Sequence, residues 1–203
     1  MMIYSTYMKT PAPTLSPILR SNAQGDLLAV LFLNPDDEFS LSDLVRRVGA
    51  LPATVHREIQ RLVDSDILTD RMVGRSRLVR VNAQHSLHAP LRELLLLTYG
   101  PKVHLEAMVA DLPGVEEAYI YGSWAARYGG ESGPTPRDVD VLVVGSTARH
   151  ALNSMAREAE LALHREVNVT RVSPEEWQQA QTPFVATLKS RPLVAIEQRT
   201  SNA

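Results

Sequence analysis

The sequence has no cysteine and no long apolar run. Without thiols, neither a disulfide framework nor a zinc site with cysteine ligands can form. The most leucine-rich stretch, LRELLLL, is far shorter than the roughly 20 apolar residues that span a bilayer, and the first sixteen residues carry no continuous apolar segment of the secretory type. We therefore expect a cytoplasmic protein with no membrane partner.

The formal net charge is only −2, which excludes a chain that is basic or acidic throughout, but the charge is unevenly distributed. Residues 46–80 hold eight Arg against four acids, a local charge of +4. Residues 101–203 hold ten basic and thirteen acidic groups, a local charge of −3. A basic segment in an otherwise mildly acidic chain indicates one surface that faces a polyanion.

A length of 203 residues, of which 44% are hydrophobic, is enough to bury one large or two small cores. The patterns along the chain favour two domains in an α+β protein. We expect an N-terminal arm, a first domain, a connecting helix at an interface and a second domain, at residues 1–20, 21–85, 86–101 and 102–198.

The first domain contains the pattern of a helix-turn-helix. A run of apolar residues at helical spacing ends at Asn34, which precedes a proline. Ser40 is placed to cap a second helix, Gly49 supplies the turn that ends it, and Pro52 suits the first turn of a third helix. Two short helices separated by such a turn predict a helix-turn-helix.

Two strand-like segments follow, at residues 67–69 and 78–81, with a Gly-containing turn at residues 73–76 between them. A helix-turn-helix followed by such a hairpin resembles the winged helix domain of bacterial regulators of the ArsR and MarR type, over residues 21–82. The resemblance implies a transcriptional regulator that binds double-stranded DNA, with the third helix in the major groove and the hairpin, or wing, beside it.

The third helix and the wing carry side chains that suit DNA. Small and hydrogen-bonding residues lie outside the apolar stripe of the helix, and Thr54, Arg57 and Gln60 are best placed to meet bases. The wing Arg residues suit phosphates or a minor groove. An alternative is that all these charges form a solvated face. The predicted DNA-binding residues are Thr54, His56, Arg57, Gln60 and Arg61 on the helix and Arg75 and Arg77 on the wing, where Arg71 is a third Arg.

The connecting segment at residues 91–99 is predicted to be a helix that is apolar nearly all round. Such a helix must be buried on more than one side. It lies either between the two domains or in the interface of a dimer, and we expect the protein to be a homodimer.

The most specific chemistry of the second domain lies within residues 119–145. A strand leads to Gly122-Ser123, a short helix and a Gly/Pro-rich loop follow, and a second strand begins with Asp138 and Asp140. Because side chains alternate along a strand, the two carboxylates lie on the same face. Their repulsion is unfavourable unless a cation lies between them, and oxygen ligands beside a Gly-Ser turn favour Mg²⁺ with a phosphate over zinc.

This pattern resembles the nucleotidyltransferase superfamily that includes DNA polymerase β and the minimal antitoxin-type nucleotidyltransferases, over residues 105–196. The resemblance implies an α/β domain with a mixed sheet. It implies that Gly122, Ser123 and Arg127 bind a nucleoside triphosphate (NTP), and that Asp138 and Asp140 hold Mg²⁺ and act in catalysis. The antitoxin-type members pair with toxins encoded beside them, so the resemblance also implies a toxin-like protein partner and repression of the protein's own operon.

One position departs from the family pattern. A third carboxylate normally lies on a later strand and helps to deprotonate the attacking hydroxyl, but the strand at residues 166–172 carries Asn168 there. An amide cannot act as a base near neutral pH, whereas Glu166 lies on the same face, so either residue is a candidate third metal ligand. We expect a domain that binds nucleotide and Mg²⁺, or a partner protein. The alternative is an active Mg²⁺-dependent nucleotidyltransferase that transfers NMP from NTP to a hydroxyl of a protein or nucleic acid.

Overall fold

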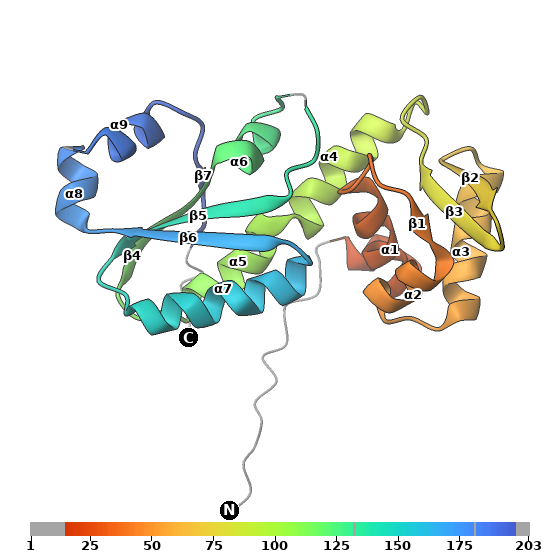
Figure 1. Ribbon diagram of the computed structural model, residues 1–203, viewed down its shortest axis with the longest axis horizontal. Helices are drawn as coiled ribbons and strands as arrows, with labels where there is room; N and C mark the ends of the chain where they lie inside the picture. The colour runs from red at the N-terminus through yellow and green to blue at the C-terminus, as the bar shows by residue number, and fades with distance from the viewer. Residues whose placement is uncertain (1–14, 132, 181, 198–203) are drawn as a thin grey trace, which may run out of the picture.

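The computed structural model of the chain describes residues 15–131, 133–180 and 182–197. It contains an N-terminal and a C-terminal domain that follow one another along the longest axis of the molecule (Figure 1). Two successive helices join them, α4 (His88–Tyr99) and α5 (Pro101–Ala110). Of the arm expected at residues 1–20, the first fourteen residues lie outside the described ranges, and Ser16–Ile18 form a short 3₁₀ helix.

The N-terminal domain is a winged helix, as predicted from the sequence. Its sheet is antiparallel with the strand order β1-β3-β2, and the hairpin of β2 and β3 forms the wing. The helices and strands are α1 (Asn22–Phe32), β1 (Phe39–Ser40), α2 (Leu41–Val48), α3 (Pro52–Asp64), β2 (Leu68–Val73) and β3 (Ser76–Val81).

The predicted boundaries of the second and third helices are confirmed with their physical causes. Ser40 Oγ accepts a hydrogen bond from the backbone nitrogen of Asp43 at 3.2 Å, which caps α2. Gly49 ends α2 in the left-handed region at φ 64°, and Pro52 is the first residue of α3. The turn between the helices is therefore fixed by local chemistry.

The sheet of the N-terminal domain differs from the prediction in two respects. The strands of the wing are longer, because pairing continues from Leu68 and Val81 to Val73 and Ser76 and includes exposed polar residues that carry no apolar pattern. An additional strand, β1, which the sequence did not predict, pairs Phe39 with Val79. Phe39 is buried, so it anchors the segment that leads into α2.

One apolar cluster fixes the arrangement of these elements. Leu31 and Phe32 of α1, Leu44 of α2 and Ile59 of α3 are fully buried together. Burial of a side chain of this size stabilises the fold by about 1.5–3 kcal/mol. The core therefore holds α3 and the wing in a set relation to each other.

The C-terminal domain is a four-stranded mixed sheet with helices on both faces. Its strand order is β6-β5-β4-β7, with β5 and β6 parallel and the other neighbours antiparallel. Strands alternate with helices along the chain, as predicted. The elements are β4 (Val115–Tyr121), α6 (Gly122–Tyr128), β5 (Asp138–Gly145), α7 (Arg149–Leu163), β6 (Glu166–Val172), α8 (Pro174–Gln179), α9 (Pro183–Lys189) and β7 (Val194–Ala195).

The central strand β5 is apolar on both faces over most of its length. Val139, Val141 and Val143 pack in a cluster with side chains of α5 and α7, and Leu142 and Val144 pack beneath α8 and α9. Figure 1 shows α8 and α9 at the end of the sheet remote from the N-terminal domain. The half of that face nearer the N-terminal domain, where β5 begins, carries polar side chains instead.

The helix α4 is part of both domains. Leu95 and Tyr99 pack in the N-terminal core, whereas Leu96 packs in the core of the C-terminal domain. This is the burial between domains that its apolar pattern predicts. Leu94 and Leu97 remain 40% and 62% exposed, so the helix also presents an apolar strip to solvent.

Arg165, just before β6, makes further contacts between the domains. It donates hydrogen bonds to the carbonyl oxygen of Pro136 at 2.5 Å, to that of Leu33 at 3.0 Å, and to Asn34 Oδ1. Its guanidinium lies over the ring of Trp124, 5.3 Å from the centroid. One half-buried side chain thus connects the end of α1 to α6 and to the loop that leads into β5.

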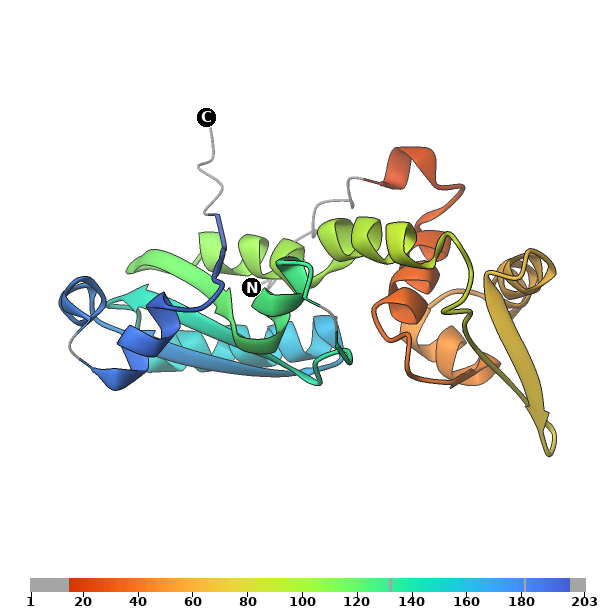
Figure 2. The ribbon, with the colours of Figure 1, turned by 90° about the horizontal axis from the view of Figure 1, so that it is seen from above.

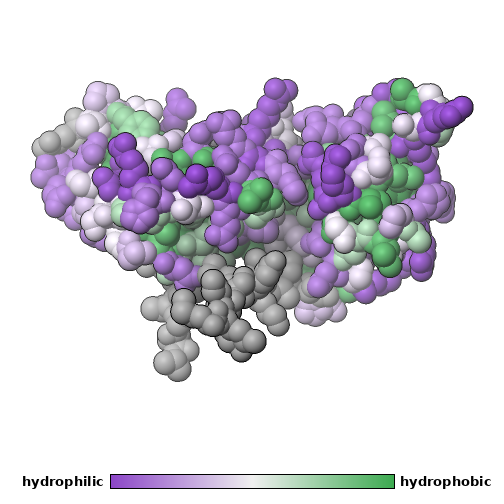
Figure 3. Space-filling view, turned by 60° about the horizontal axis from the view of Figure 1, so that its bottom comes forward, coloured by the Kyte–Doolittle hydropathy of each residue, from purple (hydrophilic) through white to green (hydrophobic). Residues whose placement is uncertain are grey.

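The surface is that of an ordinary globular chain. Hydrophilic side chains cover most of the face shown in Figure 3. Large exposed apolar residues lie in separate parts of the chain, for example Leu51 in the turn before α3, Met72 in β2 and Leu161 in α7. None of the described helices has the length and apolar character needed to cross a membrane.

Candidate functional site

The two predicted acids lie on the polar half of the C-terminal sheet. In the β5–β6 ladder Asp138 is opposite Glu166 and Asp140 is opposite Asn168, so these four side chains share one face. Tyr121, the last residue of β4, is opposite Asp140 on the other side. We call Asp138 and Asp140 the acidic pair. It lies where the covering by α8 and α9 stops.

Gly122 is required where β4 meets α6. Its φ is 68°, in the left-handed region, and a Cβ at this position would lie 2.7 Å from Asp140 Oδ2. Glycine therefore fits on two independent grounds, backbone conformation and space. The close approach also shows that Asp140 points toward the Gly122 bend, as the sequence predicts. Ser123, the next residue, is exposed in the first turn of α6.

Asn168 bridges the acidic pair. Its side-chain nitrogen donates to Asp138 Oδ2 and to Asp140 Oδ1, at 3.3 Å in both cases. Burial raises the pKa of Asp140 and the charges of Asp138 and Glu166 raise it further, whereas the hydrogen bond from Asn168 lowers it. The amide thus offsets part of a repulsion that a cation would offset more fully.

The donor set suits Mg²⁺ shared with a phosphate but not a complete metal centre. Among the described residues, no group of three or more His, Cys, Asp or Glu is placed to hold a metal. Mg²⁺ is commonly bound through one or two carboxylates together with substrate phosphates, and Asp138 and Asp140 fit that arrangement. A bound Mg²⁺ would neutralise phosphate charge. Asn168 presents N–H groups to the pair, and Glu166 does not complete a third ligand position.

Arg127 is engaged elsewhere than predicted. Its guanidinium donates to the carbonyl oxygens of Glu131 and Pro134, at 2.5 and 3.3 Å. A Cβ at Gly133 would lie 2.2 Å from the same guanidinium, so glycine lets the loop close around it. Arg127 therefore holds the loop between α6 and β5, in place of the phosphate contact that the sequence predicted.

An aromatic border of the site was missed by the sequence reasoning. The hydroxyl of Tyr121 lies 3.3 Å from Thr170 Oγ1, and its ring meets Phe184 of α9 edge-on, with 6.2 Å between centroids. Phe184 is partly exposed. The position of Tyr121 directly before Gly122 was a signal for its place on this face. Nothing in the sequence places Phe184, because α9 reaches the site only through the fold.

The predicted DNA-reading elements lie at the end of the molecule farthest from the C-terminal sheet (Figure 2). His56 and Arg57 are exposed on α3, Thr54 is half-buried there, and Arg75 is exposed in the turn of the wing. Within the described part of the chain, neither Arg57 nor Arg75 forms an ion pair with an acid. These two positive charges are therefore available to a partner.

Other predicted DNA-binding residues have partners inside the domain. Arg77 donates to Asp70 Oδ2 at 2.6 Å and to Gln60 Oε1 at 2.9 Å. Gln60 in turn donates to Asp64 Oδ1 at 2.7 Å. These contacts tie the wing to α3, so the structure gives Arg77 and Gln60 a positioning role that the sequence did not predict.

Two more Arg residues are paired. Arg61 forms an ion pair with Glu58 at 2.9 Å, and Arg71 donates to both carboxylate oxygens of Glu38, at 2.9 and 2.5 Å. Glu38 lies outside the basic segment counted from the sequence, so the charge of the wing is lower in the fold than along the chain. Exposed pairs of this kind contribute little to stability but do reduce the charge offered to DNA.

Comparisons with known proteins give only weak likenesses to solved structures. No protein-family model matches the sequence, and no curated protein matches it. Among solved structures the chain is similar to E. coli MarR at 19% identity over 47% of this chain, covering 69% of the wild-type apo form at a TM-score of 0.35. A mutant MarR complexed with operator DNA is similar at 19% identity over 47% of this chain and 66% of its own, at a TM-score of 0.34. Likenesses this weak carry no conclusion, and the winged helix assignment rests on the elements described above.

Proposed function

We propose that the protein is a DNA-binding transcriptional regulator. The observation that carries this proposal is the placement of α3 and the wing at the far end of the molecule, with Arg57 and Arg75 exposed and unpaired by acids among the described residues. The cation on α3 suits a base edge in the major groove, and the cation on the wing suits the phosphate backbone.

The proposal is tested by fluorescence anisotropy with a labelled duplex from upstream of the protein's own reading frame. Arg57→Ala is expected to lower the affinity about tenfold, since a base contact contributes about 1–3 kcal/mol. Arg75→Ala is expected to weaken binding and to flatten its dependence on salt between about 50 and 200 mM, because fewer counterions are released. Arg46→Ala, which removes an exposed Arg paired with Asp43, serves as the matched control. Unchanged affinity in both test variants would remove the basis of the proposal.

The regulator is proposed to act as a homodimer. The exposed strip of Leu94 and Leu97 on α4 supports this proposal, because α4 already contacts both domains and a second copy would cover its remaining apolar side. Sedimentation of the protein and of Leu97→Glu tests it, with a dimer expected for the first and a monomer for the second.

Repression of the antitoxin type also predicts a toxin gene beside this one, which the neighbouring reading frames test.

We further propose that the acidic pair binds an NTP together with Mg²⁺ without completing a transfer reaction. The Gly122 bend beside Asp140 supports binding, and the amide of Asn168 at the position of the third carboxylate supports the absence of transfer. Calorimetric titration with each of the four NTPs in Mg²⁺ is expected to give binding that Asp138→Ala and Asp140→Ala remove. Binding that survives both substitutions would contradict the proposal.

An active nucleotidyltransferase is the second candidate. The position of Glu166 opposite Asp138 favours it, because this carboxylate is near enough to raise the pKa of Asp140. Incubation with labelled NTPs, Mg²⁺ and the product of the neighbouring gene distinguishes the two candidates. Label that appears on a protein or nucleic acid and disappears in Asp138→Ala would establish transfer.

A further inference from the structure

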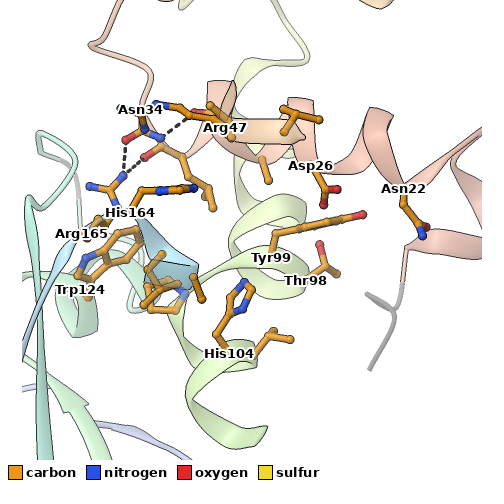
Figure 4. Close-up of a pocket in the computed structure, with 18 residues that line it drawn as sticks. Asn22, Asp26, Asn34, Arg47, Thr98, Tyr99, His104, Trp124, His164 and Arg165 are labelled. Atoms are coloured by element: carbon orange, nitrogen blue, oxygen red, sulfur yellow. Dashed lines mark hydrogen bonds between the residues drawn. The ribbon is translucent and has the colours of Figure 1, made fainter. Parts of the chain in front are cut away.

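A cavity lies between the two domains. Its volume is about 800 Å³, within the range of about 300–1,000 Å³ that is typical of small-molecule sites, which often occur where domains meet. Residues of α1 and α2 line it from the N-terminal side, and residues of α5, α6 and the end of α7 line it from the C-terminal side (Figure 4). Neither the acidic pair nor any predicted DNA-binding residue lines it.

The body of the cavity is apolar. Val30 of α1, Leu33 directly after α1 and Val48 of α2 line it from one domain, and Val103 and Leu163 line it from the other. Such a lining favours an apolar ligand, because transfer of apolar surface from water is favourable. Because neither domain alone supplies these residues, the cavity exists only in the assembled chain.

One end of the cavity is positively charged. Arg47, His164 and Arg165 line it, and Figure 4 shows them gathered beside Asn34. The guanidinium of Arg165 already donates to the carbonyl oxygen of Leu33 and to Asn34 Oδ1. The guanidinium of Arg47 lies 5.1 Å from the centroid of the Phe39 ring and forms no ion pair with a described acid. Burial lowers the pKa of His164, and the charge of Arg47 lowers it further. Burial also lowers the pKa of Arg165, whereas the nearby charge of Asp37 raises it and that of Arg47 lowers it. Arg47 is thus close enough to act on both neighbours. An anion beside it would offset the repulsion between the two guanidinium groups and could accept a hydrogen bond from the imidazole of His164.

The rest of the lining offers hydrogen-bonding groups. Figure 4 shows Asp26, Thr98 and Tyr99 at the side away from the three basic residues. Tyr99 is 7% exposed and Trp124 is 2% exposed, and neither the hydroxyl nor the indole nitrogen has a hydrogen-bond partner among the described residues. Buried polar groups without partners are unfavourable, so the lining retains capacity for hydrogen bonds to a ligand.

We propose that this cavity binds a small organic anion with an apolar body, whose acidic group is held by Arg47 and His164 and whose other end carries a group that hydrogen-bonds near Tyr99 and Asp26. The proposal does not rest on the DNA or nucleotide functions, because the residues differ. Since the walls belong to two domains, a bound molecule would favour one relative position of those domains over others.

A pair of related dyes tests the proposal on the intact protein. 1-Anilinonaphthalene-8-sulfonate has an aromatic body with an acidic group, and N-phenyl-1-naphthylamine has the same aromatic body without it. Fluorescence titration and equilibrium dialysis are expected to show one molecule of the anionic dye per chain. The anionic dye is expected to bind about tenfold more tightly than the neutral dye, as for one added charge-assisted hydrogen bond.

Two pairs of variants locate the site. Arg47→Met is expected to lower the affinity for the anionic dye about tenfold and to leave the affinity for the neutral dye unchanged. Arg46→Met, at the neighbouring position outside the cavity, is expected to change neither affinity. Ala162→Trp fills the cavity from an exposed position on α7 and is expected to abolish stoichiometric binding of both dyes. Leu161→Trp, exposed on the same helix and outside the cavity, is its control.

Equal binding by wild type and Arg47→Met, or one anionic dye per chain retained in Ala162→Trp, would overturn the proposal. Circular dichroism checks that each variant is folded. If Ala162→Trp does not fold, the comparison of Arg47→Met with Arg46→Met decides by itself.

Discussion

The two domains treat charged side chains in opposite ways. In the winged helix two of the four predicted DNA-binding Arg residues are paired with acids of the same domain, Arg61 with Glu58 and Arg77 with Asp70, and Arg71 of the wing is paired with Glu38. In the C-terminal domain two acids lie side by side, and the group between them is the neutral amide of Asn168. Ion pairs thus position the wing and α3 of the winged helix, whereas the two unpaired carboxylates of the C-terminal domain indicate a site for a ligand.

The largest expected effect on this comparison comes from a substitution of Gly122, because the Asp140 carboxylate occupies the space that a Cβ at position 122 would fill. Gly122→Ala is expected to lower nucleotide affinity at least tenfold, since its Cβ would displace the Asp140 carboxylate from 2.7 Å away. Gly130→Ala is the matched control, because Gly130 also has a positive φ, 82°, but a Cβ there would meet nothing within 4 Å. Both variants carry the backbone strain, so calorimetric titration separates the steric effect from it. Equal losses in the two would contradict this account.

A third carboxylate beside the acidic pair would increase the unpaired negative charge of the C-terminal domain. Asn168→Asp replaces the bridging amide by a carboxylate and is expected to raise the affinity for Mn²⁺ about tenfold, measured by electron paramagnetic resonance. Without metal the variant is expected to be less stable than wild type near neutral pH, because a third negative charge joins the pair. Asn168→Ala is the control, and it is expected to lose the bridge without gaining metal affinity.

Removal of the contact between the domains has a moderate effect. Arg165→Met deletes hydrogen bonds to Leu33, Pro136 and Asn34 and is expected to lower the free energy of unfolding by about 2 kcal/mol. Urea denaturation measures it with two probes, because both tryptophans of the chain belong to the C-terminal domain. Tryptophan fluorescence and circular dichroism are expected to report separate transitions in this variant. Arg157→Met, at an exposed position of α7, is expected to behave as wild type.

The smallest effect concerns the pH dependence of stability. Because the pKa of Asp140 is raised in the folded state above 3.8, its contribution to stability is fully present below pH 3.8 and is lost as pH rises through the folded value. Asp140→Asn removes this loss while keeping an acceptor for Asn168. It is expected to raise the melting temperature by about 1–3 °C at pH 7, a figure reduced for partial solvent screening. The difference should vanish in acid, and Asp111→Asn, at an exposed acid, serves as the control.

The elements that the sequence predicted well are those with local causes. The cap of α2 at Ser40, the start of α3 at Pro52 and the strand of residues 166–172 follow from side chains next to one another in the chain. Strand parity placed Asp138 and Asp140 on one face, and the positive φ of Gly122 confirmed the bend. These parts depend on spacing alone.

The remaining parts depend on contacts between distant segments. The partners of Arg71 and Arg127 are an acid before α2 and two backbone carbonyls of a loop, and neither carries a pattern in the sequence. The cavity needs both domains to be placed before it exists. Spacing along the chain predicts which side chains share a face, but it does not predict which charges the fold has already neutralised.

The assignment of neighbouring residues in α4 to different cores limits how this protein can be divided. Leu95 is buried with the winged helix and Leu96 is buried with the mixed sheet. A cut anywhere within the helix would expose an apolar side chain on at least one fragment. Chimeras that exchange the winged helix should therefore join the chains before His88 and retain the whole helix, so that Leu95 and Leu96 remain on one continuous helix.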